Sequence, residues 1–272
     1  MSETAFFTIA FVAYALAVAA YFVFLFSGRD KAARLGFLLA AAGWAAHTGA
    51  IIARTVTAGR APLANMYESV SFLAWASAVA FLGMELKFKI RKAGPFVLLI
   101  VLGLMALASS PLMPGEISPL VPALQSYWLW LHVSVTLIGE AFFAVAFITA
   151  ILYLISERKA RTSGDSGAAK AADLYDRVTY RAVAAGFPLF TLGALVFGMI
   201  WAERTWGRYW SWDPKETWSF ITWMVYALYL HTRIVMGWKG RRSAVVAILG
   251  FLAALFTYFG VNYLLSGLHS YN

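Results

Sequence analysis

The stretch Tyr127–Ile155, YWLWLHVSVTLIGEAFFAVAFITAILYLI, decides the fold class, because it is too long and too apolar for an ordinary water-soluble helix. An α-helix crosses the hydrocarbon core of a bilayer with about 20 predominantly apolar residues. Seven more runs of similar character occur along the chain, at Ala5–Phe26, Leu35–Thr57, Met66–Leu86, Gly94–Ser110, Val183–Ala202, Pro214–Met236 and Ala244–Ser266. The sequence therefore predicts an all-α polytopic membrane protein with about eight transmembrane helices.

The composition agrees with a membrane protein and excludes several kinds of chemistry. Of the 272 residues, 61% are hydrophobic and only 13% are charged. A soluble domain would have about a quarter of its residues charged. The chain has no cysteine, which excludes a disulfide framework, thiolate metal ligation and thiol–disulfide chemistry by this chain itself.

The basic residues gather on one side of the predicted membrane. All but five of the 22 Lys and Arg lie in the connections after the first, third, fifth and seventh runs. The five exceptions are Arg54, Arg60, Arg204, Arg208 and Lys215. The positive-inside rule then places both termini on the outer side of the membrane. This topology accounts for the net charge of +9, and no nucleic-acid partner is expected.

The expected organisation is a single membrane domain covering residues 1–272. Its expected parts are the first five helices (5–155), a cytoplasmic loop (156–182) and the last three helices (183–272), which include a Trp-rich outer loop (203–218). The loop is predicted to be flexible because its centre reads Thr-Ser-Gly-Asp-Ser-Gly, a run typical of irregular connections.

Two of the predicted outer helix starts have capping signals. Asn65 is followed three residues later by Glu68, and Asp213 by Glu216, which is the spacing of a capping box. Pro214 follows Asp213 at the first helical position, where proline is preferred. Helices are therefore expected to begin directly after Asn65 and Asp213.

Four histidines are the candidate ligands for a metal-containing group. His47 and His231 lie within predicted helices, His132 lies near the outer end of a third, and His269 follows the last helix on the outer side. A single membrane histidine can be a hydrogen-bonded packing residue, but ionisable residues inside a bilayer are rare and usually functional. Two inner and two outer histidines favour paired ligation of haem iron, for which imidazole is a standard axial ligand. Bare metals are poorly served, because no cysteine or acidic cluster accompanies the histidines.

The second candidate feature is the aromatic stretch 206–218, WGRYWSWDPKETW. An aromatic belt at the membrane interface would explain some of these rings. Four Trp and one Tyr on one outer loop are denser than anchoring requires. A flat apolar surface edged by Arg208 suits the face of a porphyrin and its anionic propionates. Asp213 and Glu216 are most simply cap residues, and no residue is assigned a catalytic role.

The motif WGxxWxWDxxExW at 206–218 resembles the tryptophan-rich WWD signature of a superfamily of haem-handling membrane proteins. An outer histidine on each side of the motif, here His132 and His269, is similar to the CcmC, CcmF and CcsA (ResC) branches. The eight spans and the further pair His47 and His231 look like the CcsA/ResC branch of system II cytochrome c biogenesis. The segment 65–69, Asn-Met-Tyr-Glu-Ser, also resembles that branch.

The resemblance implies a route for haem b across the membrane. His47 and His231 would hold haem that enters from the cytoplasmic side, and His132 and His269 would then hold it at the outer face. The further residues expected to contact haem at the outer site are Trp206, Trp210, Trp212, Asp213, Trp218 and Arg208. Trp218 begins a helix, so a structural role is an alternative for that ring.

The resemblance also implies partners and a location. With a CcsB/ResB-type membrane partner, the vinyl groups of haem would be joined to the Cys-x-x-Cys-His thiols of apocytochrome c. The chain would then be part of a cytochrome c synthase (haem lyase) complex, with a thioredoxin-like reductant as a further partner. The expected location is a bacterial inner membrane or a thylakoid-type membrane.

Three alternatives stay open on sequence alone. They are a CcmC-like haem handler without synthase activity, a bis-histidine electron-transfer cytochrome, and a secondary transporter with a histidine proton relay. A cytochrome b-like carrier typically has two ligating histidines on one helix, and no predicted helix here has two. A transporter would be favoured by an internal repeat and broken helices, and neither is evident in the sequence.

Overall fold

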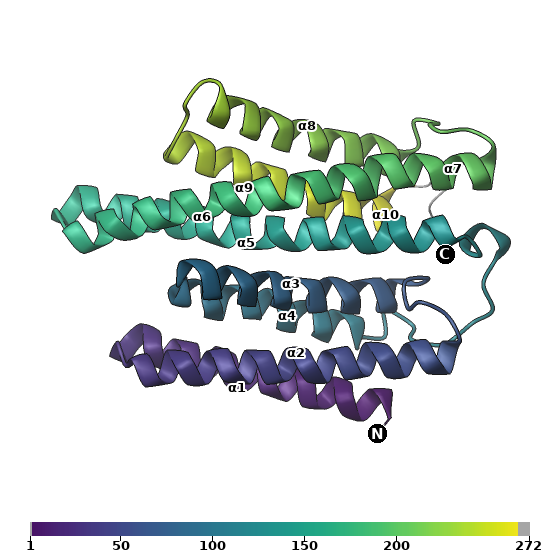
Figure 1. Cartoon of the computed structure of the whole chain (residues 1–272), viewed down its shortest axis with the longest axis horizontal. Coiled ribbons are helices and arrows are strands. Elements are labelled where there is room, and N and C mark those ends of the chain that lie inside the picture. The colour runs from purple at the N-terminus through teal and green to yellow at the C-terminus, as the bar shows by residue number, and fades with distance from the viewer. Residues whose placement is uncertain (1, 266–272) are drawn as a thin grey trace. The chain divides into compact units, whose positions relative to one another are not determined.

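The computed structural model describes residues 2–265, which are almost entirely helical and contain no β-strand (Figure 1). The chain forms two compact units, Met1–Gln125 and Ser126–Asn272. The first unit contains α1 (Glu3–Ser27), α2 (Asp30–Ala58), α3 (Met66–Phe88), η1 (Arg91–Ala93), α4 (Gly94–Ala108) and η2 (Pro122–Leu124). The second contains α5 (Tyr127–Ser163), α6 (Ser166–Phe190), η3 (Thr191–Phe197), α7 (Gly198–Trp206), α8 (Pro214–Ile234), α9 (Arg241–Leu255), η4 (Phe256–Gly260) and α10 (Val261–Leu264).

The predicted fold class, an all-α membrane protein, is confirmed. Within the described residues, seven helical segments are long and apolar enough to cross a membrane: Glu3–Ser27, Asp30–Ala58, Met66–Phe88, Arg91–Ala108, Tyr127–Ser163, Ser166–Trp206 and Arg241–Leu264. The expected span Pro214–Met236 is not among these seven, although α8 has 21 residues. Its Trp, Tyr, Thr and His residues lower its mean hydropathy. The outer position of both termini stays a prediction.

The first unit is an antiparallel bundle in which α1 packs on α2 and α4, and α3 packs on the same two helices. Aromatic rings of α1 lie directly on the backbone of α2. A Cβ atom at Gly36 would lie 2.9 Å from the ring of Tyr21, and one at Gly43 would lie 3.0 Å from the ring of Tyr14. Both tyrosines are fully buried, so these two glycines set how closely the first two helices approach.

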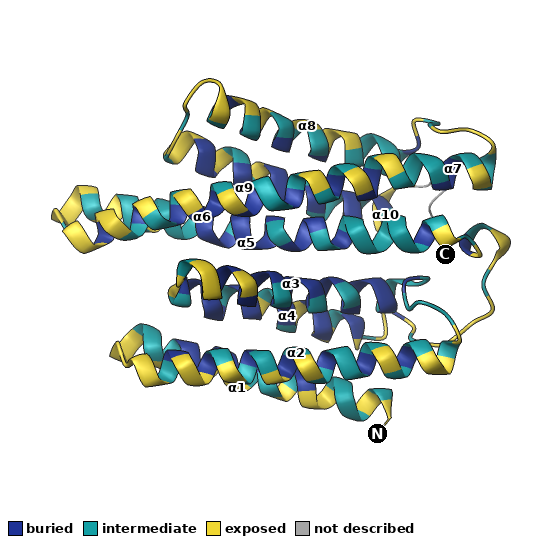
Figure 2. Ribbon diagram, viewed as in Figure 1, coloured by how far each residue is buried: buried dark blue, intermediate teal, exposed yellow. Residues whose placement is uncertain are grey.

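The second unit is built on the α5–α6 hairpin, against which α8 and α9 pack. The two hairpin helices touch backbone to backbone, since a Cβ at Gly139 would lie 2.8 Å from the backbone nitrogen of Phe190. Tyr226 of α8 stacks on Phe143 of α5 with ring centroids 3.7 Å apart. Figure 2 shows buried residues along the sides where the helices of each unit meet. The outward faces carry large apolar side chains, among them those of Ile9, Leu16 and Val23, as expected for surfaces in contact with lipid.

The flexible loop predicted over 156–182 is wrong, because helix continues through it. Only Gly164 and Asp165 lie between α5 and α6. Gly164 ends α5 at φ 62°, and the Asp165 carboxylate accepts hydrogen bonds from the first backbone N–H groups of α6. The Gly-Asp pair is therefore a turn between two helices, and the Ala-, Arg- and Lys-rich flanks favour helix. The division between the units falls at Gln125, before α5, and not after the fifth helix.

The helix that leaves this hairpin is interrupted by a π-helical segment. Residues 166–206 form one continuous run in which η3 joins α6 to α7. Pro188 lies just before η3, within the last turn of α6. A proline removes one backbone donor and disturbs the helix around it, so the regular α-helical bonding is interrupted at both Pro188 and the adjoining η3.

Gly139→Ala is expected to destabilise the second unit by about 1–3 kcal/mol, because the added methyl group would force two backbones apart. Gly103→Ala is the matched control, since a Cβ at that helical position meets nothing within 4 Å. Thermal unfolding of the detergent-solubilised chain, followed by circular dichroism, measures both. An unchanged Tm for Gly139→Ala would show that the backbone contact does not hold the hairpin together.

Candidate functional site

His132 is the best-defined candidate ligand in the described chain. It lies in the second turn of α5, and its Nδ1–H donates a hydrogen bond of 2.8 Å to the backbone carbonyl of Gly193. A carbonyl oxygen can only accept, so Nδ1 carries the proton and the lone pair is on Nε2. A backbone carbonyl bound to one ring nitrogen is the usual support for a histidine that ligates a metal through the other.

The π-helical segment η3 brings the Gly193 carbonyl to this position. The carbonyl also accepts the N–H of Gly198, which is the five-residue bond of a π-helix. A Cβ at Gly193 would collide with the backbone of Thr136, and one at Gly198 would lie 3.0 Å from Nδ1 of His132. Because Gly193 and Gly198 have no side chain, η3 and α7 approach α5 closely enough to orient the imidazole.

Trp201 of α7 covers one face of the His132 ring. The two rings are nearly parallel, 6° apart, with centroids separated by 5.8 Å. Trp201 is itself buried, and Trp206 packs edge-on against it at 4.8 Å. Trp201 was not predicted from the sequence because it lies outside the aromatic motif. Its only signal was a helical position five residues before Trp206.

The predicted Trp-rich loop is shorter than expected, because helix includes both of its ends and leaves residues 207–213 between α7 and α8. Within it, Trp212 has a positive φ of 60° and its side chain is 69% exposed. A bulky residue in this conformation is strained. Trp210 is half-buried and packs edge-on against Trp212 at 5.6 Å. Tyr209 and Arg208 are exposed beside them.

The predicted capping box at the start of α8 is confirmed and holds this strained loop. Glu216 accepts hydrogen bonds from the backbone N–H of Ser211 at 2.7 Å and of Asp213 at 3.3 Å. Asp213 is buried and accepts from the backbone of Lys215. Trp218 is half-buried and packs against Phe256 at 4.3 Å, so its ring lies between α8 and η4.

A polar contact ties the start of α8 to α10. The Lys215 ammonium, which is half-buried, donates to Oδ1 of Asn262 in α10 at 3.0 Å. This contact joins the end of the Trp-rich loop to the last described helix.

His47 is completely buried in the first unit. Its Nε2 shares a hydrogen bond of 3.0 Å with Ser71, and the rings of Phe7 and Tyr14 meet it edge-on at 5.8 and 6.2 Å. The Nδ1 atom of His47 has no hydrogen-bond partner among the described residues, and neither has the Tyr14 hydroxyl. Buried polar atoms without partners are costly, so this part of the bundle is suited to a further ligand.

The structure says less about the other two predicted ligands, His231 and His269. His231 is exposed near the end of α8, three residues before the last residue of that helix. His47 and His231 belong to different units, and their sharing of one iron stays a prediction. His269 lies outside the described residues, so its pairing with His132 also stays a prediction.

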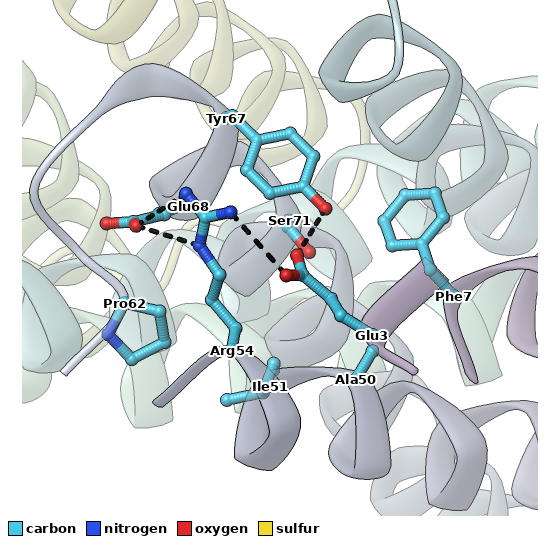
Figure 3. Close-up of a pocket in the computed structure, with 9 residues that line it drawn as sticks. All are labelled: Glu3, Phe7, Ala50, Ile51, Arg54, Pro62, Tyr67, Glu68 and Ser71. Atoms are coloured by element: carbon cyan, nitrogen blue, oxygen red, sulfur yellow. Dashed lines mark hydrogen bonds and ion pairs between the residues drawn. The ribbon is translucent and has the colours of Figure 1, made fainter. Parts of the chain in front are cut away.

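A second polar site lies at the end of the first unit where α1 begins and α2 ends (Figure 3). The predicted N-cap is confirmed, since Asn65 accepts from the backbone of Glu68, but Glu68 does not complete the capping box. Its fully buried carboxylate instead binds Arg54 and Arg60, at 3.0 and 2.8 Å. From the sequence, Arg54 and Arg60 were noted only as two of the five basic residues outside the predicted cytoplasmic connections.

Comparison with known proteins gives one consistent result. A family model described as "Cytochrome C assembly protein" matches residues 63–269. Relatives named "Cytochrome c biogenesis protein CcsA" include that of Gloeobacter violaceus, which is 36% identical over 82% of this chain and 82% of its own length. The one from Synechococcus elongatus is 38% identical over 80% of this chain and 81% of its own. The one from Pyropia yezoensis is 35% identical over 94% and 93%.

A solved structure is also similar. The chain titled "Cytochrome c Heme Lyase CcmF" superposes with a TM-score of 0.69 at 17% identity, covering 95% of this chain. This chain spans only 47% of that protein, about half of its length. At such low identity the likeness concerns the fold.

Trp212→Gly is expected to be more stable than Trp212→Ala by about 1 kcal/mol, the reverse of their order at an unstrained position. Glycine adopts a positive φ without strain, whereas alanine retains it. Chemical denaturation of both variants, monitored by far-UV circular dichroism, measures the difference. If the alanine variant were the more stable, the left-handed conformation of residue 212 would not be a source of strain.

Proposed function

This chain belongs to the cytochrome c assembly protein family, as a CcsA-type multi-pass membrane protein of cytochrome c biogenesis, and from that premise we propose that it delivers haem b to the outer face of the membrane. Haem is the molecule handled and handed on, so it is treated as a substrate. At the outer face, this proposal has haem presented to apocytochrome c for covalent attachment.

The observation that carries the proposal is the hydrogen bond between His132 and the Gly193 carbonyl. It fixes the ring tautomer and so places the lone pair on Nε2, the nitrogen that would bind iron in this proposal. Trp201 holds the ring in one orientation from the side. In this proposal His269 supplies the second imidazole, and bis-imidazole ligation keeps the iron from reacting with oxygen while the haem edge stays available.

The Trp-rich loop would provide the apolar surface against which the porphyrin lies. Trp212 and Tyr209 are exposed at 69% and 60% although both are large aromatic side chains. Trp206 and Trp210 would add further ring contacts, and Trp210 already packs edge-on against Trp212. The cap residue Asp213 would hold the end of the loop in place, since it accepts a hydrogen bond from the backbone of Lys215. Arg208, exposed on the same loop, would pair with a propionate, since guanidinium binds carboxylate through charge-assisted hydrogen bonds.

The inner pair His47 and His231 would hold haem in transit through the membrane. The support is the burial of His47 together with the unsatisfied polar atoms beside it. A neutral imidazole with an unused nitrogen is a competent iron ligand. His231 is exposed on its own unit, so its imidazole is accessible to a ligand from outside that unit.

Attachment itself would require partners. A CcsB/ResB-type membrane protein would complete the synthase, and a thioredoxin-like reductant would keep the apocytochrome thiols reduced. Each thioether bond forms when a Cys-x-x-Cys-His thiol adds across a haem vinyl group, so that sulfur bonds to one vinyl carbon and a proton to the other. The proposed location is a bacterial inner membrane or a thylakoid-type membrane.

His132→Ala is expected to abolish cytochrome c maturation, because the outer iron would lose an axial ligand. Imidazole added to the medium should restore part of the activity by filling the vacant coordination position, which a fold defect would not allow. The measurement is the amount of covalently bound haem in a reporter cytochrome c. Maturation at the parent level in His132→Ala would contradict the assignment.

Trp206→Ala, Trp210→Ala and Trp212→Ala are expected to weaken haem retention, each by about 1 kcal/mol or roughly fivefold in Kd, because each removes aromatic contact with the porphyrin. Trp218→Ala is the comparison variant, and it should lower thermal stability more than haem affinity because its ring packs on Phe256. Haem titration of purified protein gives the affinities. Haem affinity equal to that of the parent in all three loop variants would return the loop to the role of a membrane anchor.

A further inference from the structure

A small pocket opens at the end of the first unit that holds the start of α1 and the end of α2 (Figure 3). The residues that line it are Glu3, Phe7, Ala50, Ile51, Arg54, Pro62, Tyr67, Glu68 and Ser71. Two carboxylates and a guanidinium therefore face one another at the mouth of a mainly apolar cavity, close to the buried His47.

The guanidinium of Arg54 is held by Glu68 on one side, whereas its Nη1 atom makes only a long hydrogen bond on the other. Its Nε donates to Oε1 of Glu68 at 3.0 Å, and its Nη2 lies 3.0 Å from the same oxygen. The remaining nitrogen, Nη1, reaches only Glu3, at 3.5 Å. Charge-assisted N–H···O bonds are normally about 2.7–2.9 Å long. The Glu68 side aligns the guanidinium, while the side facing Glu3 can accept a better-placed carboxylate.

Glu3 is the exchangeable partner in this network. Its side chain is 22% exposed, whereas that of Glu68 is fully buried. Besides the long contact with Arg54, its carboxylate accepts a hydrogen bond of 2.7 Å from the Tyr67 hydroxyl. Glu3 can therefore move into water without unmaking the Arg54–Glu68 pair. Nη1 of Arg54 and the hydroxyl of Tyr67 would then both point at the position that the Glu3 carboxylate had occupied, and both could donate to another carboxylate there.

The pocket adjoins the imidazole of His47 along one face of α2. His47, Ala50, Ile51 and Arg54 are spaced at three, four and seven residues, which places them on the same side of the helix. Seven residues correspond to about 10 Å of rise. Ser71 lines the pocket and shares a hydrogen bond with His47. A flat molecule anchored at His47 and extending along this face would bring its edge to Arg54.

We propose that Arg54 binds one propionate carboxylate of the haem ligated by His47, and that Glu3 occupies this position until haem arrives. The proposal rests on the proposed haem-binding role of His47. A porphyrin has both propionates at one edge, several ångströms from the iron, which matches the separation of Arg54 from His47. One carboxylate replaces another, so the charge around Arg54 and Glu68 is conserved. Tyr67 donates to the incoming carboxylate as it donated to Glu3.

The test compares two ligands that differ only in the propionates: haem and haem dimethyl ester, in which both carboxylates are blocked. The full chain is purified in detergent with His132→Ala, so that the outer site is weakened, and each ligand is titrated by its Soret absorption. In this parent, haem should bind more tightly than the ester. Arg54→Met should weaken haem binding roughly tenfold and leave ester binding unchanged, which erases the preference.

Two further variants separate propionate binding from a general loss of structure. Arg60→Met removes an equal charge from the same Glu68, yet Arg60 does not line the pocket, so the preference for haem over the ester should persist. Glu3→Gln removes the competing carboxylate and should strengthen haem binding. A purely structural role for the Glu3–Arg54 contact predicts the opposite, because Glu3→Gln would then loosen the site.

The outcomes distinguish the two proposals. If His47→Ala in the same parent does not weaken haem binding, the proposed haem-binding role of His47 is wrong, and the inference about Arg54 is wrong with it. If His47→Ala weakens binding but Arg54→Met changes haem and ester affinities equally or not at all, only the propionate assignment is overturned. Loss of the preference in Arg54→Met but not in Arg60→Met supports it.

Discussion

Inside hydrocarbon each peptide N–H and C=O has to find its partner within the protein, and this requirement explains why the described residues are helical almost throughout. It also gives meaning to each departure from regular helix. The π-helical turn at Gly193 keeps its backbone bonded while offering the same carbonyl to the imidazole of His132. The Trp-rich loop leaves helix for only the seven residues 207–213, and Glu216 of the capping box after it accepts hydrogen bonds from the backbone N–H groups of Ser211 and Asp213. The candidate site thus lies at two departures from regular α-helix, η3 and the loop 207–213, where other hydrogen bonds replace some of those that a regular helix would make.

Much of the fold follows from sequence because apolar run length is a one-dimensional property. The first residues of α3 and α8 were also predictable from the sequence, because the N-cap residues Asn65 and Asp213 bind backbone N–H groups only two or three residues away. The flexible loop over 156–182 was predicted wrongly because Gly164 and Asp165 suit a flexible loop and a tight turn between helices equally. The rest of that segment consists mostly of residues with high helix propensity, which indicated the correct structure.

The site was less predictable, because its geometry depends on contacts between distant segments. The position of His132 near a helix end was visible in the sequence, but its partner lies 61 residues away in Gly193. Trp201 matters only because η3 turns it onto the imidazole ring. Likewise, Glu68 binds Arg54 of α2 and Arg60 of the α2–α3 connection, and also the backbone N–H of Ala64, instead of the N-cap N–H of Asn65, and this choice follows from how α2 packs on α3. Sequence spacing suggests which residues take part, and tertiary packing decides which of them meet.

The length of α5 has a mechanical consequence. Its 37 residues span about 55 Å, far more than the roughly 30 Å of hydrocarbon. The excess lies at the end where α5 turns into α6, so the paired helices project from the membrane there as a stiff arm. His132 lies near the opposite end of the same uninterrupted helix, about 47 Å from Ser163. A rigid-body tilt of this helix would therefore displace its projecting end and the imidazole of His132 together.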